Sequence, residues 1–597
     1  MIFKNALFFL ILYFICSGLF NGKIYSQNDT LAIVDGKPIT SDDFINRFEL
    51  SVYPGKGLNE DLNKVKLDFL YSLIAEKLLS NKSSNSVSDP DPNEKYLKNE
   101  IEMIFLRDAL YHKEVLSKVK VTPKELKTGI KYSSYSYIVD AFYFPDSLWA
   151  DSFLKRIKNK DSKYIYHLAD SLNLCHDTLR ISYGESDETI ENAFFDHNIG
   201  FNSKPTNTVD GWVVFRILDK NLNEKFSSLP PAERSKKVND IISNRIGYRI
   251  GRDYLLSVMK GVTVNVNYKI FTPLVYKIKS ILATHRPAGF DKGYYLSREE
   301  LLNLKNTFSY DPRAPMLKFK GMELSLGYIF DNLSLAGFAP PDTSVSEITY
   351  SLHMALRFIV QNYFLAQRAK SLGMELSPEV KYNTQMFLDA YLSNKISDEI
   401  MDTVKISENE INNYFETHKD EVLKDIMLRL QIFSFDNLDE AVTVLNRLNH
   451  DRNSRQDTTG AVWLHAYQLS EIGAVIAQLN NGDTYGPLLL KGKYTIFRLL
   501  DKRSKISQRE ISNSLQMSKE MLINQMRREA IDKYLAKLAG EQSVKIFKSN
   551  LKNVSVTPIQ MLTFRYIGFG GKIIAVPSLY PREDWINYMK DDKNIFP

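Results

Sequence analysis

Residues 213–221 read VVFRILDKN, and residues 495–503 read TIFRLLDKR. Each string is an apolar run of strand length that ends in charged residues, so each predicts a buried β-strand followed by a turn. The two strings are 282 positions apart, and upstream Gly200 and Gly482 have the same separation. Two similar strands with one spacing suggest that the chain contains an internal repeat.

Earlier segments extend the repeat. Residues 32–48 (AIVDGKPITSDDFINRF) align with residues 317–333 (LKFKGMELSLGYIFDNL) at an offset of 285. Residues 121–130 (VTPKELKTGI) align with residues 406–415 (ISENEINNYF) at the same offset. Matches that keep one order and nearly one offset predict two copies of a module of about 280 residues.

Each copy is expected to open with helices. A short extended segment with a glycine turn comes first, at Gly36 in copy one and Gly321 in copy two. In copy two, Ser344 and Glu347 form a capping-box pattern. The apolar positions after it have helical spacing; they are Ile348, Leu352, Leu356, Ile359, Tyr363 and Ala366.

The later half of each copy is predicted to contain strands as well as helices. An aromatic strand (139–144 or 428–435) is followed by a helix, a short helix and a closing strand. This β-α-α-β order predicts an α+β unit of about 100 residues. A long amphipathic helix is expected after it, at 231–260 and 508–539. The fold class predicted for the whole chain is therefore α+β, as a tandem duplicated module.

Composition agrees with a multidomain globular protein. The chain has 597 residues, of which 44% are hydrophobic and 25% are charged, and this length suggests about three to five domains. The net charge of +6 comes from 77 basic and 71 acidic residues. Such a weak bias does not indicate a nucleic-acid partner, which would need a concentrated basic face.

The N-terminus predicts export. Residues 1–26 (MIFKNALFFLILYFICSGLFNGKIYS) carry Lys4, an apolar run over 6–16 and then small and polar residues. This order is typical of a secretory signal peptide cleaved after Ser26. The alternative is an uncleaved membrane anchor, although the run is shorter than the ~20 apolar residues of a spanning helix. The mature chain would keep only Cys175, so no internal disulfide is expected.

Three strings carry a family resemblance: residues 31–44 (LAIVDGKPITSDDF), residues 406–415, and GDTYGP at 482–487 with IFRLLD at 496–501. In this order they resemble exported foldases built on parvulin-type (PpiC/rotamase) domains, of the SurA, PpiD and PrsA kind. The resemblance implies a SurA-like helical chaperone region, a parvulin-like domain, and a long helix that returns to pack on the helices before it.

The resemblance and the repeat together give the expected domains. They are a signal peptide (1–26), a first chaperone-like region (27–118), a first parvulin-like domain (119–222), a first returning helix (223–270), a connector (271–312), a second chaperone-like region (313–404), a second parvulin-like domain (405–505), a second returning helix (506–545) and a C-terminal tail (546–597). In the tail, a hairpin is expected around Gly570-Gly571.

The resemblance also locates degenerate catalytic positions. Active parvulins are similar to one another in a histidine on the first strand and a second one on the closing strand. This chain has Ala141 and Gln431 at the first position and Val213 and Thr495 at the second. Isomerisation of a prolyl bond breaks no covalent bond of the substrate, so losing both histidines weakens the case for an isomerase without excluding one. No residue is therefore assigned as catalytic.

Binding of clients is the remaining role. A chaperone needs apolar and aromatic surface with a polar rim. The candidates on the two first strands are Phe142, Tyr143, Phe144, Ile432, Phe433 and Phe435. Each of these side chains also suits a buried strand face, and alternation alone does not decide between the two interpretations.

Other chemistries lack their motifs. The nine histidines form no HExxH motif and no Cys/His spacing typical of zinc ligands, so no metal site is expected. No nucleotide-binding glycine pattern is present, so no cofactor is expected.

The expected function is an exported, ATP-independent chaperone for unfolded or partly folded secreted and outer-membrane proteins, located in the periplasm. An active prolyl isomerase and a scaffold with one fixed partner are the alternatives. The clients and the oligomeric state stay open.

Overall fold

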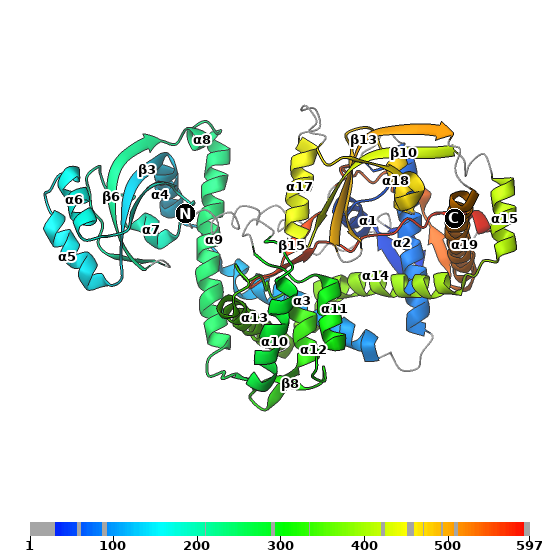
Figure 1. Ribbon diagram of the computed structural model, residues 1–597, viewed down its shortest axis with the longest axis horizontal. Helices are drawn as coiled ribbons and strands as arrows, with labels where there is room; N and C mark the ends of the chain where they lie inside the picture. The colour runs from blue at the N-terminus through cyan, green and yellow to red at the C-terminus, as the bar shows by residue number, and fades with distance from the viewer. Residues whose placement is uncertain are drawn as a thin grey trace. The chain divides into compact units, whose positions relative to one another are not determined.

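The computed structural model describes residues 30–56, 61–85, 92–208, 211–287, 293–333, 335–418, 424–436, 438–450, 459–469, 471–490, 493–506, 511–560 and 562–589 (Figure 1). The expected signal peptide lies outside these residues. Among the described helices, none is both long enough and apolar enough to cross a membrane. The described residues divide into two compact units, one of residues 111–257 and one that combines residues 30–110 with 258–589.

The first unit is built on one antiparallel sheet, with strand order β4-β3-β6-β5. Its elements are α4 (Pro123–Ser133), β3 (Tyr135–Phe144), α5 (Ser147–Ile157), α6 (Ser162–Ser171), β4 (His176–Ser182), α7 (Glu188–Asn192), β5 (Thr206–Thr208), β6 (Gly211–Leu222), α8 (Glu224–Ser227) and α9 (Pro231–Val258). The expected β-α-α-β order is confirmed, and two further strands, β4 and β5, flank the central pair.

Strand alternation gives this sheet two cores. Phe142 and Phe144 of β3 pack with Phe153 of α5 and Leu168 of α6 on one face. Val139 and Ala141 pack on the opposite face, with Phe194 and Phe195. The sheet is therefore covered on both sides, as expected when successive side chains point to opposite faces.

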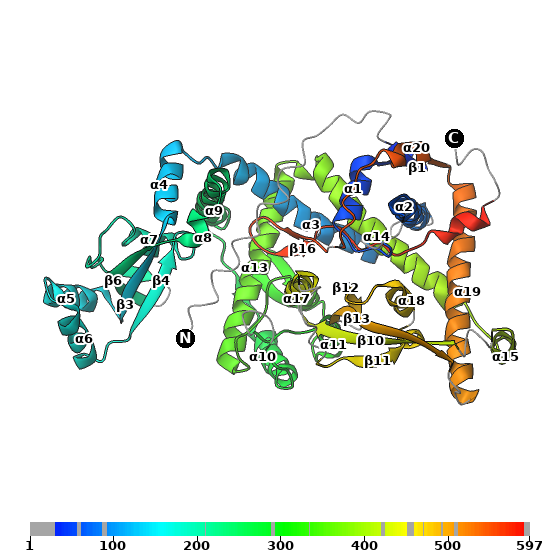
Figure 2. The ribbon, with the colours of Figure 1, turned by 90° about the horizontal axis from the view of Figure 1, so that it is seen from above.

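The second unit contains another sheet with the equivalent order, β11-β10-β13-β12. Its elements are α15 (Glu408–Thr417), β10 (Lys424–Phe435), α17 (Leu438–His450), β11 (Val462–His465), η5 (Ala466–Leu469), α18 (Glu471–Gln478), β12 (Thr484–Leu490), β13 (Lys493–Ile506) and α19 (Ile511–Glu541). Figure 2 shows this sheet with α17 and α18 beside it, and α19 running past its end.

The two sheets also share an irregularity. The pairing of β3 with β6 shifts between Ile138 and Val139, and the pairing of β10 with β13 shifts between Arg429 and Leu430. In addition, the Gly200 N–H donates to the carbonyl of Ile217 at 2.8 Å, and the Gly482 N–H donates to the carbonyl of Leu499 at 2.6 Å. The matched spacing in the sequence thus corresponds to matched pairing in the sheets.

The two helical regions open with similar hairpins. The first has β1 (Thr30–Val34), β2 (Lys37–Thr40), α1 (Ser41–Glu49), α2 (Leu62–Asn85) and α3 (Pro92–Glu114). The second has β8 (Pro315–Phe319), β9 (Met322–Ser325), α12 (Leu326–Leu333), α13 (Val345–Ser371), η4 (Met374–Leu376) and α14 (Pro378–Thr403). Half of the expected capping box is present: the Ser344 side chain accepts from the Glu347 N–H, whereas the Ser344 N–H donates to the Asp342 carboxylate and not to Glu347. Ile348, Leu352 and Leu356 are buried as expected.

Each opening hairpin is completed by a third strand. Strand β7 (Asn265–Val266), which follows α9, pairs with β8. Strand β14 (Val544–Ile546), which follows α19, pairs with β1 near the other end of the chain. The resemblance implies that each long helix packs on the helices before it; α19 packs on α14 and also on α2.

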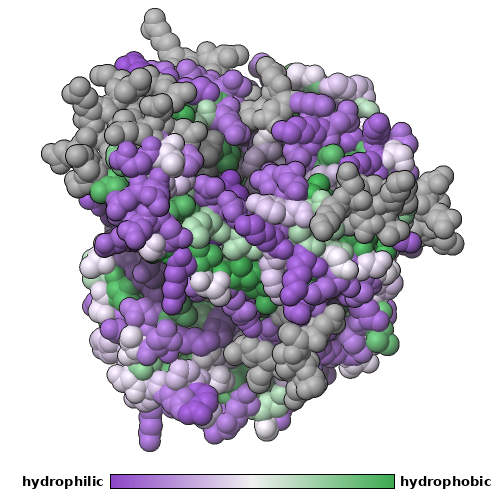
Figure 3. All heavy atoms as spheres, turned by 90° about the vertical axis from the view of Figure 1, so that its right-hand side faces the viewer, coloured by the Kyte–Doolittle hydropathy of each residue, from purple (hydrophilic) through white to green (hydrophobic). Residues whose placement is uncertain are grey.

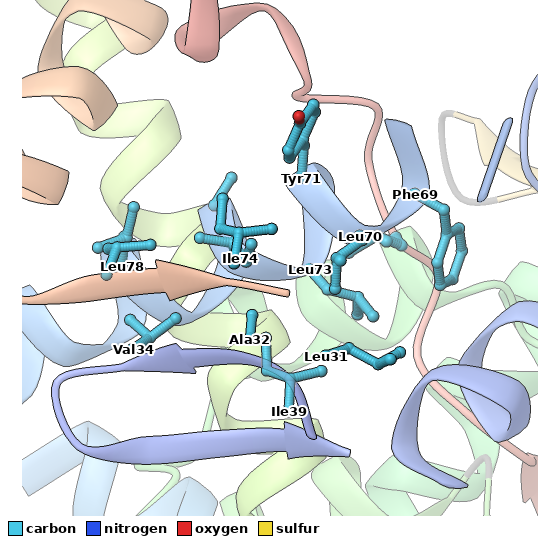
Figure 4. Close-up of a cluster of buried hydrophobic side chains, with 14 of the residues drawn as sticks. Leu31, Ala32, Val34, Ile39, Phe69, Leu70, Tyr71, Leu73, Ile74 and Leu78 are labelled. Atoms are coloured by element: carbon cyan, nitrogen blue, oxygen red, sulfur yellow. The ribbon is translucent and has the colours of Figure 1, made fainter. Parts of the chain in front are cut away.

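The resulting N-terminal core joins distant segments of the chain. Its buried residues come from positions 31–79 and from positions 531–585. Figure 4 shows β1 side chains directed toward α2, with strand β14 alongside β1. Burial of this shared apolar surface is the main stabilising term.

The remaining segments are structured. The expected connector contains α10 (Tyr268–Leu282) and α11 (Arg298–Thr307). The tail contains α20 (Lys548–Lys552), β15 (Phe564–Tyr566), β16 (Lys572–Ile574) and η6 (Asp584–Tyr588), and β15 pairs with β16 as the expected hairpin. The face drawn in Figure 3 is mostly hydrophilic, with hydrophobic residues gathered near its middle.

Candidate functional site

A cavity of about 130 Å³ lies on one face of the first sheet. Its floor is apolar and consists of Tyr143 on β3 with Val213 and Phe215 on β6. A cavity of about 150 Å³ with apolar walls holds one benzene ring. This space therefore suits one ring or one aliphatic side chain of a bound chain.

The walls of the cavity come from the strands and loops around this floor. The lining residues besides the floor are Leu179, Arg180 and Ile181 of β4, Glu185, Ser186 and Ile190 before and in α7, and Thr208 of β5. Arg180 and Glu185 are exposed, whereas Leu179 and Ile190 are half-buried. The site thus combines an apolar interior with charged groups at its edge.

A buried ion pair fixes the wall formed by residues 184–191. The Glu191 carboxylate accepts from the Gly184 N–H at 2.7 Å and from Arg245 Nη2 on α9, also at 2.7 Å. Burial raises the pKa of Glu191, and the opposite charge of Arg245 lowers it. Charge-assisted hydrogen bonds of this kind hold a loop in one geometry, so the cavity wall is preorganised.

The sequence-based site positions lie in this sheet. Val213 is in the cavity floor, directly opposite Tyr143 in the strand pairing. Ala141 lies on the same face, fully buried in the core. Tyr143, named as a client-binding candidate, and Val213, named as a degenerate catalytic position, are thus brought together.

The strand pairing corrects one of the matches that the sequence suggested between the two sheets. Gln431 lies opposite Arg498, and the residue opposite the equivalent Arg216 is Asp140. Gln431 is therefore the counterpart of Asp140, one residue before Ala141. The Asp140 carboxylate accepts from the Thr178 hydroxyl at 2.7 Å and from the Tyr166 hydroxyl, on the side of the sheet away from the cavity.

Two aromatic candidates of copy one point away from the cavity. Phe142 and Phe144 are buried under α5 and α6, so a client does not reach them in this structure. In copy two, Ile432 is 37% exposed, whereas Phe433 and Phe435 pack partly buried against α17.

The second sheet carries a polar pair at the equivalent position. Thr495, the counterpart of Val213, lies opposite Ser434, and their hydroxyl oxygens are 3.2 Å apart. At this matched position the first sheet therefore presents an aromatic and an apolar side chain, and the second sheet two hydroxyl groups. Gln431, on the other face, is buried and donates to the carbonyl of Thr459 at 3.1 Å.

The sequence did not single out the remaining wall residues. Leu179, Ile181 and Ile190 belong to β4 and α7, and neither element was assigned as a separate feature. The alternation of Leu179 and Ile181 with polar neighbours is the signal that marks β4 as a half-buried strand. Thr208 belongs to a three-residue strand, which carries too little pattern to be found from sequence.

Comparisons with known proteins give likenesses in structure. No protein-family model matches the chain, and no curated protein does. The solved structure of peptidylprolyl isomerase PrsA from Bacillus anthracis is similar to it at 14% identity and a TM-score of 0.17, covering 32% of this chain and 96% of PrsA. One of the SurA-like chaperones PEB4 and Cj1289 of Campylobacter jejuni is similar at 17% identity and a TM-score of 0.20, covering 38% of this chain and 98% of that one.

A third likeness is to foldase protein PrsA from Streptococcus pneumoniae, at 11% identity and a TM-score of 0.18, covering 39% of this chain and 94% of that protein. With likenesses this distant, a proposal of function depends on the chain's own residues.

Proposed function

We propose that this chain is an exported, ATP-independent chaperone that binds unfolded or partly folded polypeptides, with secreted and outer-membrane proteins as clients. The observation that carries the proposal is the cavity with Tyr143, Val213 and Phe215 as its floor and Arg180 and Glu185 at its edge. An apolar centre with a polar rim is the usual composition of a surface that binds other chains. No histidine or cysteine is among the described residues that line it, which supports holding a segment over catalysis.

The proposal includes location and organisation. The signal-peptide pattern of residues 1–26 supports export to the periplasm. The equal strand order and the matched register shifts support a tandem duplication of a chaperone-like helical region followed by a parvulin-like domain. We place the module boundaries as the sequence suggests, with copy one at 27–270 and copy two at 313–545.

Two assays on residues 27–597 test this function. One follows aggregation of an unfolded model client, and the other follows cis–trans isomerisation of a proline tetrapeptide. The variants Leu179→Asp and Ile190→Asp each place a charge in the cavity wall, and burying an unpaired charge is strongly unfavourable. Leu148→Asp on α5, where Leu148 is 78% exposed, is the matched control.

We expect the mature chain and the Leu148→Asp control to suppress aggregation, and both cavity variants to suppress it less. Fast isomerisation that the cavity variants abolish would favour the isomerase alternative. Absence of both activities, together with one tight partner, would favour a scaffold.

A further inference from the structure

A second, larger hollow lies in the helical region of copy two. It has a volume of about 490 Å³. One side consists of the small residues Ala336, Gly337 and Ala339, and the other of Tyr350, Met354 and Phe358 on α13. Tyr350 is 63% exposed and Met354 44% exposed. We call this hollow the α13 groove.

In copy one, the chain's own tail covers the corresponding loop. Residues 50–53 of copy one align with residues 335–338 of copy two at the offset of 285. The Gln560 side chain accepts from the Tyr53 N–H at 3.0 Å and donates to the Tyr53 carbonyl. The Thr563 N–H donates to the carbonyl of Leu50 at 3.3 Å. The tail therefore binds this loop mainly through the loop's main chain.

The tail also covers the adjoining face of α2. Trp585 is fully buried, and its indole N–H donates to the Tyr71 carbonyl at 3.2 Å. The Arg582 N–H donates to the Ser72 hydroxyl at 2.9 Å. Figure 4 shows the ring of Tyr71 directed toward the C-terminal segment. Trp585 and two hydrogen bonds from the tail thus cover this face of α2.

The covered face of copy one corresponds to the open groove of copy two. The same offset of 285 places Ser72, whose hydroxyl accepts from the Arg582 N–H, at Arg357, which lines the α13 groove. Tyr71 corresponds to the neighbouring Leu356, which is buried in the core of the helical region. The tail that fills copy one only reaches the edge of the groove, where Gly570 approaches Phe358.

We propose that the α13 groove binds an extended segment of an unfolded polypeptide in which an aromatic side chain lies next to acidic residues. The chain's own residues 583–585, Glu-Asp-Trp, are the internal example of such a segment. Arg357 is the charged residue among those that line the groove, and it complements acidic neighbours of the aromatic ring. Met354 adds a flexible side chain of the kind common at permissive binding surfaces. This inference rests on the proposed chaperone function and names a substrate class and a second site for it.

The probe for the test is a fluorescein-labelled peptide with the sequence of residues 579–589, LYPREDWINYM. Its binding to residues 27–597 is followed by fluorescence anisotropy. We expect saturable binding at one site, at least about ten-fold weaker for Met354→Glu, because this variant places a carboxylate beside the acidic residues of the peptide. Replacing the tryptophan of the peptide by alanine is expected to have a similar effect.

Leu302→Glu on the exposed surface of α11 is the matched control and is expected to bind the peptide as the parent does. Tyr350→Ala is a second groove variant that introduces no charge, and circular dichroism verifies that each variant is folded. Absence of saturable binding, or binding that both groove variants leave unchanged, would overturn the proposal. Self-association of the mature chain that Met354→Glu abolishes would assign the groove to the tail of a second copy and would also overturn it.

The aggregation assay separates this inference from the proposed function. Suppressed aggregation without peptide binding would contradict the proposed binding to the groove and would still support the chaperone function. Peptide binding to the groove without suppression of aggregation would contradict the proposed chaperone function. It would therefore also contradict the assignment of the groove to unfolded clients.

Discussion

Ala32 of β1 lies directly opposite Ile546 of β14, a strand from the far end of the chain. At the equivalent place in copy two, Leu317 lies opposite Val266. The residue after Ala32 pairs with Lys545, and the residue after Leu317 pairs with Asn265. The register is thus the same in both sheets, although β14 comes from the far end of the chain and β7 from the segment shortly before β8.

The pairing of β14 with β1 makes the C-terminal part of the chain a component of the N-terminal core, and Trp585 offers a test of this role. Trp585→Ala removes a fully buried indole that packs on Tyr71. We expect a loss of about 3–5 kcal/mol in the free energy of unfolding, as for other large buried aromatics. Urea denaturation measures the loss. Tyr580→Ala, at an exposed tail position, is expected to change stability by less than about 0.5 kcal/mol. Equal stabilities of the two variants would contradict a structural role for the tail.

A buried ion pair ties the first two helices of the chain together. Arg47 of α1 and Glu76 of α2 form two hydrogen bonds of 2.9 Å, and their side chains are only 3% and 4% exposed. Glu76→Ala leaves a buried guanidinium unpaired, which is expected to cost about 3–5 kcal/mol. Lys118→Ala, in an exposed pair with Glu114, is expected to cost less than about 1 kcal/mol.

The double variant Arg47→Met with Glu76→Leu completes this experiment. Apolar replacement of both partners removes the charge without leaving an unpaired group, so stability is expected to return to near that of the parent chain. Chemical denaturation of the parent and the three variant proteins gives the comparison. A double variant as unstable as Glu76→Ala would show that packing, and not the unpaired charge, causes the loss.

The sequence was sufficient to predict the opening hairpins, the closing strand and the start of α13 at Ser344. The offset between Gly36 and Gly321 identified the opening hairpins, and the string at 213–221 identified the closing strand, because local residue patterns determine these elements. The pairing of β7 with β8 and of β14 with β1 could not be predicted, since both β7 and β14 are short and suit either hairpin. The choice of partner depends on tertiary packing, which a local pattern does not contain.

The candidate site was predicted only partially for the same reason. Val213 and Tyr143 were found because they lie on strands with strong apolar patterns. The wall residues Ile190 and Thr208 come from elements too short to show periodicity. Gln431 was matched to Ala141, and the strand pairing matches it to Asp140, because a register difference of one residue is not visible in two dissimilar strings.

The stability of the folded chain is expected to depend on pH because of Glu583, a partly buried carboxyl group in the C-terminal tail. Burial, together with Asp584 and Asp68, raises the pKa of Glu583 to about 7 from its ordinary value of 4.5. The folded state therefore holds this proton more tightly than the unfolded state, and the stabilisation is complete below pH 4.5 and lost as pH rises to about 7. The melting temperature of the parent should fall over this range, and that of Glu583→Gln should fall less. Glu233→Gln, at an exposed site on α9, should follow the parent. A Glu583→Gln curve parallel to that of the parent would contradict the assignment.

The two opening hairpins should differ in their ability to fold alone. The core around β8 and β9 is formed by buried residues between 270 and 360, so one continuous piece of chain supplies it. The core around β1 and β2 needs residues 531–585 as well as residues 31–79. We therefore expect the fragment 259–371 to unfold cooperatively on heating and the fragment 27–118 to show no cooperative transition, because it lacks the strand and the tail that cover its apolar face. Circular dichroism during heating distinguishes them. Adding the fragment 511–597 to 27–118 should restore a transition, whereas adding it to 259–371 should not raise the melting temperature. Independent folding of 27–118 would show that its hairpin is stable without strand β14.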